Sequence, residues 1–250
     1  RGKITDSDGA ALTQPPKLLV HLHLHYLDQI ELFSDAFENV TDCESDLCIT
    51  SSSNIEEISE FFDRSGKDSM SIKVPNIGYD AYPFLKVLHS YNLSKYDYVL
   101  KLHTKNARPP ERATVYGIDI PEYTWRDDLL GALLGSREKF SANLRTLEQD
   151  RSIGCLGSER YIFSTLENKE EQNYRLPEWR ARLNLDDCTR YIGGTMFLGR
   201  AFPFERLKLT PLDELGFEEK KLVTGAHKDM AHIFERLFGL VIESEGLSIE

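Results

Sequence analysis

The sequence predicts an α/β fold, a single domain in which a mainly parallel sheet is flanked by helices. Short apolar runs of strand length alternate along the chain with longer segments whose apolar residues recur at helical spacing. With 250 residues, 40% of them hydrophobic, the chain can bury the core of one such domain. Ligands of such sheets bind at the carboxyl ends of the strands, so we expect the site in the segments that follow each apolar run.

The first half of the chain alternates strands and helices. Strands are predicted at 17–24, 46–53, 70–76 and 96–105, and helices at 26–40, at the segment NIEEISEFF and at 81–89. Ser53 or Asn54 can cap the second helix, because both side chains accept hydrogen bonds from backbone N–H groups. The apolar centre of YDYVLKLHTK marks a buried strand.

The second half of the chain is less regular. It contains a proline-rich loop at 108–122, a long helix at 125–150, strand-like segments at 152–159 and 190–200, a polar segment that includes LPEWRARLN, and a final helix at 225–243. We find no internal repeat, so we expect one domain over residues 17–250. Residues 1–16 form a polar linker or tail ending in Pro15 and Pro16, which is consistent with a domain excised from a longer multidomain protein.

Composition narrows the functional classes. The formal net charge of −11 argues against a nucleic-acid partner, because phosphate contacts need clustered lysines and arginines. Four cysteines without a CxxC pair are too few for a disulfide scaffold and favour a reducing compartment. No apolar run approaches the ~20 residues that span a bilayer, and the N-terminus lacks the pattern of a signal peptide. We therefore expect a soluble, cytoplasmic protein.

Three histidines, His21, His23 and His25, occupy alternate positions of VHLHLHYL and so share one face of the first strand. They could bind zinc. However, same-face Cα atoms lie ~6.6 Å apart, which is awkward for a tetrahedral ion, and no cysteine or carboxylate stands nearby in sequence. In the alternative interpretation, His21 packs under a helix while His23 and His25 face a ligand cleft.

Polar residues follow the strand at 96–105. KLHTKN places Lys101, His103 and Lys105 at the ligand edge of the sheet, and two cations with several donors suit a diphosphate. A solvated strand end is the alternative. NIGYDAYPFL places Gly78 and Asp80 just before a helix, where an ordinary strand-to-helix turn would have the same pattern.

Two further segments are candidates. YIGGTMFLGR pairs glycines with an apolar strand, which suits either close approach of a ligand or a structural bulge. In the last helix, Asp229, His232 and Arg236 form one polar stripe with Glu235 beside it, facing either a cleft or solvent. The chain has no GxGxxG, GxxxxGK[ST], HExxH or GxSxG motif. At the level of motifs this argues against a dinucleotide-binding protein, a P-loop NTPase, a zincin metalloprotease and a serine hydrolase.

The segments taken in order resemble the rhamnan-synthesis protein F family, a group of bacterial polysaccharide glycosyltransferases. They are HLHYLDQIELFSDAF, DLCITSSS, VPNIGYDAYPFL, YDYVLKLHTKN, WRDDLLGALLGS, IGGTMFLGR and AHIFERLFG. The resemblance covers about residues 18–239, and KLHTK, GGTMFLGR and AHIFERLFG are its most specific parts. The family is similar to the GT-A glycosyltransferases, so the resemblance implies a GT-A-like nucleotide-binding domain. KLHTK then stands where GT-A enzymes carry a DxD motif that holds a divalent ion.

The resemblance also implies roles for individual residues. Lysines at the DxD position imply a transferase that requires no metal, although Mg²⁺ or Mn²⁺ is not excluded. Asp229 is the first candidate for the base that deprotonates the acceptor, then Glu235 and Asp80. The implied donor site comprises His23, His25, Tyr26, Thr50, Ser51, Asn76, Gly78, Lys101, His103 and Lys105. The implied acceptor site comprises Gly193, Gly194, Thr195, His232 and Arg236.

Three functions remain open at this point. The first is transfer of a sugar, L-rhamnose by the family's name, from a dTDP-, UDP- or GDP-sugar to a lipopolysaccharide, capsule or wall glycan. A lipid-linked acceptor would imply peripheral association with the inner membrane face. The second is a noncatalytic sugar- or nucleotide-binding module of a glycan-assembly protein, and the third is a metal-dependent hydrolase built on the histidine strand.

Overall fold

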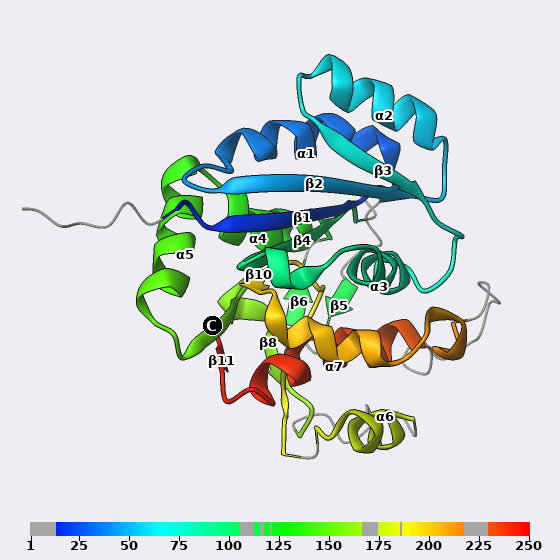
Figure 1. Ribbon diagram of the computed structural model, residues 1–250, viewed down its shortest axis with the longest axis vertical. Helices are drawn as coiled ribbons and strands as arrows, with labels where there is room; N and C mark the ends of the chain where they lie inside the picture. The colour runs from blue at the N-terminus through cyan, green and yellow to red at the C-terminus, as the bar shows by residue number, and fades with distance from the viewer. Residues whose placement is uncertain are drawn as a thin grey trace, which may run out of the picture.

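A seven-stranded sheet forms the centre of the computed structural model (Figure 1). The structure describes residues 14–105, 113–115, 118–120, 122–166, 175–185, 187–217 and 230–250. The sheet order is β11-β7-β10-β4-β1-β2-β3. Its strands are β1 (Lys17–His23), β2 (Glu44–Ser51), β3 (Ser69–Lys73), β4 (Tyr98–His103), β7 (Ile153–Leu156), β10 (Phe197–Arg200) and β11 (Ser248–Ile249).

The sheet is mainly parallel, as predicted. Strands β3, β2, β1 and β4 pair in parallel, whereas β10 runs antiparallel to both β4 and β7. His23 at the end of β1 is in register with Thr50 on β2 and His103 on β4. The carboxyl ends of three strands therefore meet at one edge of the sheet, where the sequence predicted the site.

Helices cover both faces of the sheet (Figure 1). They are α1 (Ile30–Ala36), α2 (Ile55–Arg64), α3 (Ala81–Ser90), α4 (Glu122–Leu134), α5 (Arg137–Gln149), α6 (Leu176–Leu183) and α7 (Met230–Glu243). Side chains alternate along each strand, so Leu19 and Val99 pack towards α3 and α7, whereas Leu100 and Leu198 pack towards α1, α4 and α5. His21, His23, Lys101 and His103 share the parity of Leu19 and Val99, which places them on the α3 and α7 face.

Two predicted elements are divided in the structure. The helix predicted at 125–150 is two helices, because α4 ends at Leu134 and the side chain of Ser136 accepts a hydrogen bond from Lys139 N at 3.2 Å, which caps α5. The strand predicted at 190–200 is also two: β9 (Arg190–Ile192) pairs with β8 (Ile162–Ser164), and only β10 joins the main sheet. Apolar periodicity continues across both breaks, so it did not reveal them.

Other segments contain structure that the sequence did not predict. The proline-rich loop includes the hairpin strands β5 (Ala113–Val115) and β6 (Ile118–Ile120), and the polar segment near LPEWRARLN includes α6. The linker prediction for residues 1–16 lies mostly outside the described residues. None of the described helices combines the length and the apolar character needed to cross a membrane.

Candidate functional site

A cavity of about 420 Å³ opens at the carboxyl edge of the sheet. This volume is within the range of small-molecule sites. Eleven of the residues predicted for the site line it: His23, His25, Tyr26, Asn76, Asp80, His103, Lys105, Gly194, Thr195, His232 and Glu235. Five other residues that line it were not assigned a role in advance: Tyr79, Ala81, Thr104, Trp125 and Ala231. The remaining predicted residues lie behind the wall, except Asp229, which is outside the described residues.

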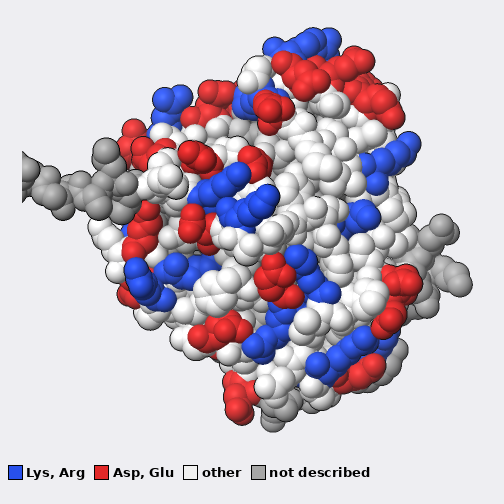
Figure 2. All heavy atoms as spheres, in the orientation of Figure 1, with Lys and Arg blue, Asp and Glu red and all other residues white. Residues whose placement is uncertain are grey.

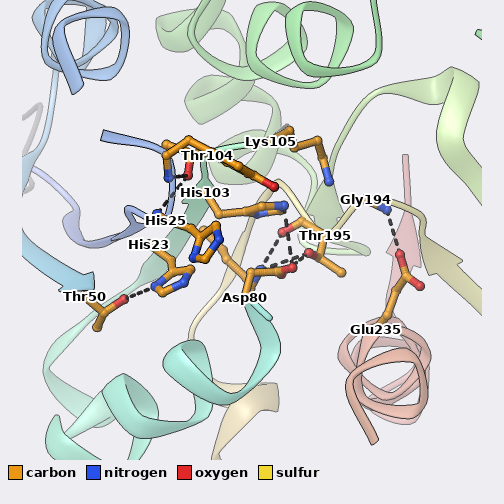
Figure 3. A network of polar contacts seen from close by, with 12 residues as sticks. His23, His25, Thr50, Asp80, His103, Thr104, Lys105, Gly194, Thr195 and Glu235 are labelled. Carbon is orange, nitrogen blue, oxygen red and sulfur yellow. Dashed lines mark hydrogen bonds and ion pairs between the residues drawn. The ribbon is translucent and has the colours of Figure 1, made fainter. Parts of the chain in front are cut away.

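The histidines of β1 take two different positions. His21 is fully buried and stacks on Phe84 of α3, with ring centroids 5.6 Å apart, whereas His23 lines the cavity. Thr50 Oγ1 lies 2.9 Å from His21 Nε2 and 3.0 Å from His23 Nδ1, so one hydroxyl orients both rings. Figure 3 shows the contact between Thr50 and His23. Burial lowers the pKa of His23 to about 4, which makes this imidazole neutral near pH 7.

Thr50 and Ser51 were predicted to contact the donor, but the structure places them inside the protein. Both are buried, and the Ser51 hydroxyl donates to the backbone oxygen of Leu24 at 2.6 Å. Leu24 N in turn donates to Thr50 O at 2.8 Å. The TSSS segment therefore fixes the chain that leaves β1 and does not itself line the cavity.

Lys101 belongs to a buried network with Asp80 and Thr195 and does not line the cavity; Figure 3 shows how Asp80 and Thr195 face each other. Its side chain is 0% exposed, and Nζ lies 2.5 Å from Asp80 Oδ2, 2.9 Å from Thr195 O and 3.0 Å from Thr195 Oγ1. The Thr195 hydroxyl donates to the same oxygen of Asp80. This cluster joins the end of β4, the residue before α3 and the turn before β10. Lys101 therefore holds three segments of the cavity wall in contact with one another, although it does not itself line the cavity.

Asp80 presents a carboxylate to the cavity. Its side chain is 20% exposed, and Oδ1 lies 3.6 Å from His103 Nε2. Burial alone would raise the pKa of Asp80, but the neighbouring His103, Lys101 and Lys105 outweigh this effect and hold the pKa well below its usual range. We take the Lys101 ammonium as the main partner, because burial lowers the pKa of His103 well below its usual range and leaves that ring neutral.

Lys105 supplies a cation to the cavity. Among the described residues that line it, only Lys105 carries an ammonium or guanidinium group. Its Nζ lies 3.9 Å from the centroid of the Trp125 ring, and burial, opposed by Asp80 and Glu235, lowers its pKa to about 8. Figure 3 shows this side chain directed towards the loop that carries Gly194. The two lysines of KLHTK therefore have different environments: Lys101 is fully buried and does not line the cavity, whereas Lys105 does.

Hydrogen bonds between side chains and backbone join the chain after β4 to the chain after β1. Lys105 N donates to Gln29 Oε1 at 3.3 Å, and the Gln29 amide donates to Lys105 O. Thr104 Oγ1 accepts from the backbone N–H groups of His25 and Tyr26, each at 3.0 Å. Thr104 and Lys105 thus also hold the ends of the neighbouring strands β4 and β1 together, a structural role that their sequence did not indicate.

Several buried polar atoms of this wall lack a hydrogen-bond partner in the part of the chain that the structure describes. They are both ring nitrogens of His103 and Nε1 of Trp125. Buried polar atoms are usually paired in folded proteins, so atoms of this kind in a cavity wall are available to a bound polar ligand.

The last helix contributes Glu235 and His232 to the wall but not Arg236. Glu235 Oε1 accepts from Gly194 N at 2.8 Å (Figure 3). Its Oε2 lies 2.9 Å from Arg236 Nη1. The Arg236 guanidinium is buried and lies 5.0 Å from the Tyr191 ring centroid. The predicted polar stripe is therefore split, with His232 at the cavity and Arg236 behind it.

Glycines allow two close approaches at the site. Gly194 has φ +81°, and a Cβ at this position would lie 2.7 Å from a side-chain atom of Leu129 and 3.0 Å from Trp125. Gly78 has φ +63°, and its Cβ would lie 2.4 Å from the Phe217 ring. Only Gly194 lines the cavity, while Gly78 and Gly193 lie behind it.

The residues at the end of β4 do not fit a divalent cation. In the described ranges, no group of three His, Cys, Asp or Glu side chains is arranged to hold a metal ion. At and just after the end of β4 lie the ammonium groups of Lys101 and Lys105 and the imidazole of His103, and the nearby Asp80 carboxylate is engaged by Lys101.

Comparisons with known proteins point to one family. The family model described as "Rhamnan synthesis protein F" matches residues 2–246. Two curated relatives are both named "Uncharacterized protein WxcX", from Xanthomonas campestris pv. campestris strains B100 and ATCC 33913. Each is 26% identical over 239 residues, which cover 92% of this chain and 32% of the relative. The chain thus spans about a third of the length of the curated relatives that it matches.

Proposed function

Since this chain belongs to the rhamnan synthesis protein F family, we propose that it is a glycosyltransferase. In this proposal it moves a sugar from a nucleotide-diphospho-sugar to a growing bacterial surface polysaccharide. The family match supports a role in polysaccharide synthesis. The observation that carries the proposal is the 420 Å³ cavity, which places one cation and two neutral imidazoles at the carboxyl edge of a mainly parallel sheet.

Lys105 is the residue that meets the diphosphate in this proposal. Glycosyl transfer leaves a nucleotide diphosphate whose negative charge must be stabilised as the glycosidic bond breaks. An ammonium group at the cavity surface can do this directly. The single N–H of the neutral His103 ring and the N–H of Trp125, which have no hydrogen-bond partner among the described residues, can donate hydrogen bonds to phosphate oxygens. Lys101 has a different part: it holds Asp80 and Thr195 in place. Transfer proceeds without a divalent metal in this scheme.

The base that deprotonates the acceptor remains to be chosen among three carboxylates. Asp229 stays the first candidate on the resemblance alone. Of the two described carboxylates, Glu235 is 11% exposed and accepts a hydrogen bond from Gly194 N, whereas Asp80 is 20% exposed and paired with Lys101. Asp80 is ionised at neutral pH because of its low pKa, so it can orient a hydroxyl but is a weak base.

Substrates and location follow as further parts of the proposal. The donor is dTDP-L-rhamnose by the family's name, or another dTDP-, UDP- or GDP-sugar, and the acceptor is a glycan or lipid-linked glycan. The chain then works in the cytoplasm, peripherally at the inner membrane face when the acceptor is lipid-linked. Nucleic acid is not a proposed partner, because the net charge is −11 and acidic and basic side chains are interspersed on the face shown in Figure 2.

Calorimetric titration tests the proposal. UDP, GDP and dTDP, with CMP as a control, would be titrated into the chain in EDTA and again in Mn²⁺. We expect one diphosphate to bind in EDTA, and Lys105→Met to weaken that binding more than tenfold while the protein stays folded. Binding only in Mn²⁺ would overturn the metal-free scheme. Absence of binding by all three would overturn the nucleotide site itself.

A noncatalytic sugar- or nucleotide-binding module is the second candidate function. It is favoured by one observation: both described candidate carboxylates are already engaged, Asp80 by Lys101 and Glu235 by Gly194 N and Arg236. The two functions differ in donor hydrolysis. A transferase slowly releases free sugar and nucleotide diphosphate from its donor without an acceptor, whereas a binding module releases neither.

A further inference from the structure

Tyr79 is held in an unfavourable backbone conformation at the cavity. Its φ is +50°, and it follows Gly78, whose φ is +63°. A bulky residue in the left-handed region is an outlier, and such strain in folded proteins is concentrated at functional sites. The Tyr79 side chain nevertheless lines the cavity and is 49% exposed. Because about half of Tyr79 is exposed, burial of its ring does not offset the free-energy cost of this backbone conformation.

The neighbours of Tyr79 explain how the strain is maintained. On one side, Phe217 packs so closely against Gly78 that no side chain fits there, and Gly78 O accepts from Ala81 N at 3.0 Å. On the other side, the Asp80 carboxylate is anchored by Lys101 and Thr195. A residue between two such anchors has little backbone freedom, so the fold imposes the backbone conformation of Tyr79.

The ring of Tyr79 forms one wall of the cavity together with His232. The two ring centroids lie 6.1 Å apart at an interplanar angle of 72°. Tyr79 precedes α3 and His232 lies in the first turn of α7, whereas Lys105 follows β4 and His25 and Tyr26 follow β1. The cavity thus has an aromatic wall built from different elements than its cationic wall.

We propose that Tyr79, with His232 beside it, is the stacking platform for a pyranose ring of the acceptor glycan. One face of a pyranose is a patch of C–H bonds and its rim carries hydroxyls. An exposed phenol matches this chemistry, because the ring face is apolar while the hydroxyl and the nearby imidazole can form hydrogen bonds. This inference rests on the proposed function, in which Lys105 takes the diphosphate. It adds the residue that recognises the sugar.

The test compares Tyr79→Asn with Tyr79→Phe. Asparagine adopts left-handed backbone conformations readily but lacks a ring, and phenylalanine keeps the ring but lacks the hydroxyl. Saturation-transfer NMR would measure binding of methyl α-L-rhamnopyranoside and methyl α-D-glucopyranoside at millimolar concentrations. Calorimetry would measure the nucleotide diphosphate in parallel, and thermal unfolding would report stability.

We expect Tyr79→Asn to bind a methyl glycoside about tenfold more weakly, as for loss of a stacked ring. Nucleotide binding should be unchanged, and Tm should equal or exceed that of the parent because strain is relieved. Tyr79→Phe should retain most of the glycoside binding. These results together would support the platform.

Five outcomes would overturn it. Unchanged glycoside binding in Tyr79→Asn would show that the ring is not a platform. A lower Tm would show that the ring is kept for stability, and weaker nucleotide binding at unchanged Tm would assign it to the nucleobase. Nucleotide binding by the parent without glycoside binding would remove the platform but leave the proposed function standing. If the parent bound neither, the proposed function would fail with it.

Discussion

Replacing Lys101 by methionine tests the buried network beneath the cavity. The Lys101 side chain is fully buried, with its ammonium against Asp80 and Thr195 and 5.5 and 5.6 Å from the ring centroids of Phe84 and Phe238. Methionine has nearly the same length and is apolar, so Lys101→Met keeps the packing volume. It removes the charge and three donated hydrogen bonds.

The expected loss of stability follows from the charge left behind. Removing one partner of a buried ion pair costs about 3–5 kcal/mol, because the other charge stays buried and unpaired. Asp80 is 20% exposed and can be partly solvated, so we place the cost of Lys101→Met at about 2–4 kcal/mol. For a protein of this size, that corresponds to a decrease in Tm of roughly 4–16 °C.

Urea denaturation followed by far-UV circular dichroism would measure this loss. Lys105→Met is the matched control: its ammonium lies against the Trp125 ring, so its loss should cost only about 1 kcal/mol. The double variant Lys101→Met/Asp80→Asn removes the stranded charge as well. It should recover about 1–3 kcal/mol relative to Lys101→Met alone.

Two results would refute this reasoning. If Lys101→Met unfolded within about 1 kcal/mol of the parent, the network would not be a structural tie. If the double variant were no more stable than Lys101→Met, the cost would come from packing and not from an unpaired Asp80 carboxylate.

Three further predictions concern pH and backbone conformation. The pKa of Lys105 is about 8, so its ammonium group is present below that pH. Diphosphate affinity, measured by calorimetry, should therefore fall as pH rises through 8. Lys105→Arg should abolish this pH dependence, because arginine stays charged. His23 has a folded-state pKa of about 4, below its unfolded value of about 6.5. The contribution of His23 to the free energy of unfolding is therefore fully present above pH 6.5 and is lost as pH falls towards 4, by up to about 1.4 kcal/mol per pH unit. In urea denaturation at several pH values, His23→Gln should reduce this dependence of the unfolding free energy on pH. Gly194→Ala should lower the free energy of unfolding by about 1–3 kcal/mol, because φ is +81° and the added Cβ would meet Leu129. Gly131→Ala, at a helical position where a Cβ would have nothing within 4 Å, should raise the free energy of unfolding by up to about 1 kcal/mol. Equal thermal stability of the two variants would contradict this assignment.

The part of the site that could be predicted from sequence follows from local rules. Alternation along β1 distinguishes His21 and His23 from their neighbours. The rule that parallel strands present their carboxyl ends at one edge brings His23 and His103 together. Helix α2 and its Asn54 cap were also predicted, because capping depends on residues three positions apart. The roles of Asp229 and of the metal-free scheme stay predictions.

What the sequence by itself determined is the order of strands and helices in the first half of the chain and the edge of the sheet at which polar residues gather, because these depend on periodicity over a few residues. Only the tertiary structure decided which lysine of KLHTK reaches the cavity. Lys101 and Lys105 have the same charge, and they differ because Asp80 and Thr195, which lie 115 positions apart in sequence, meet at Lys101. Tyr79 and Trp125 line the cavity for the same reason, since no local pattern encodes contacts between distant segments.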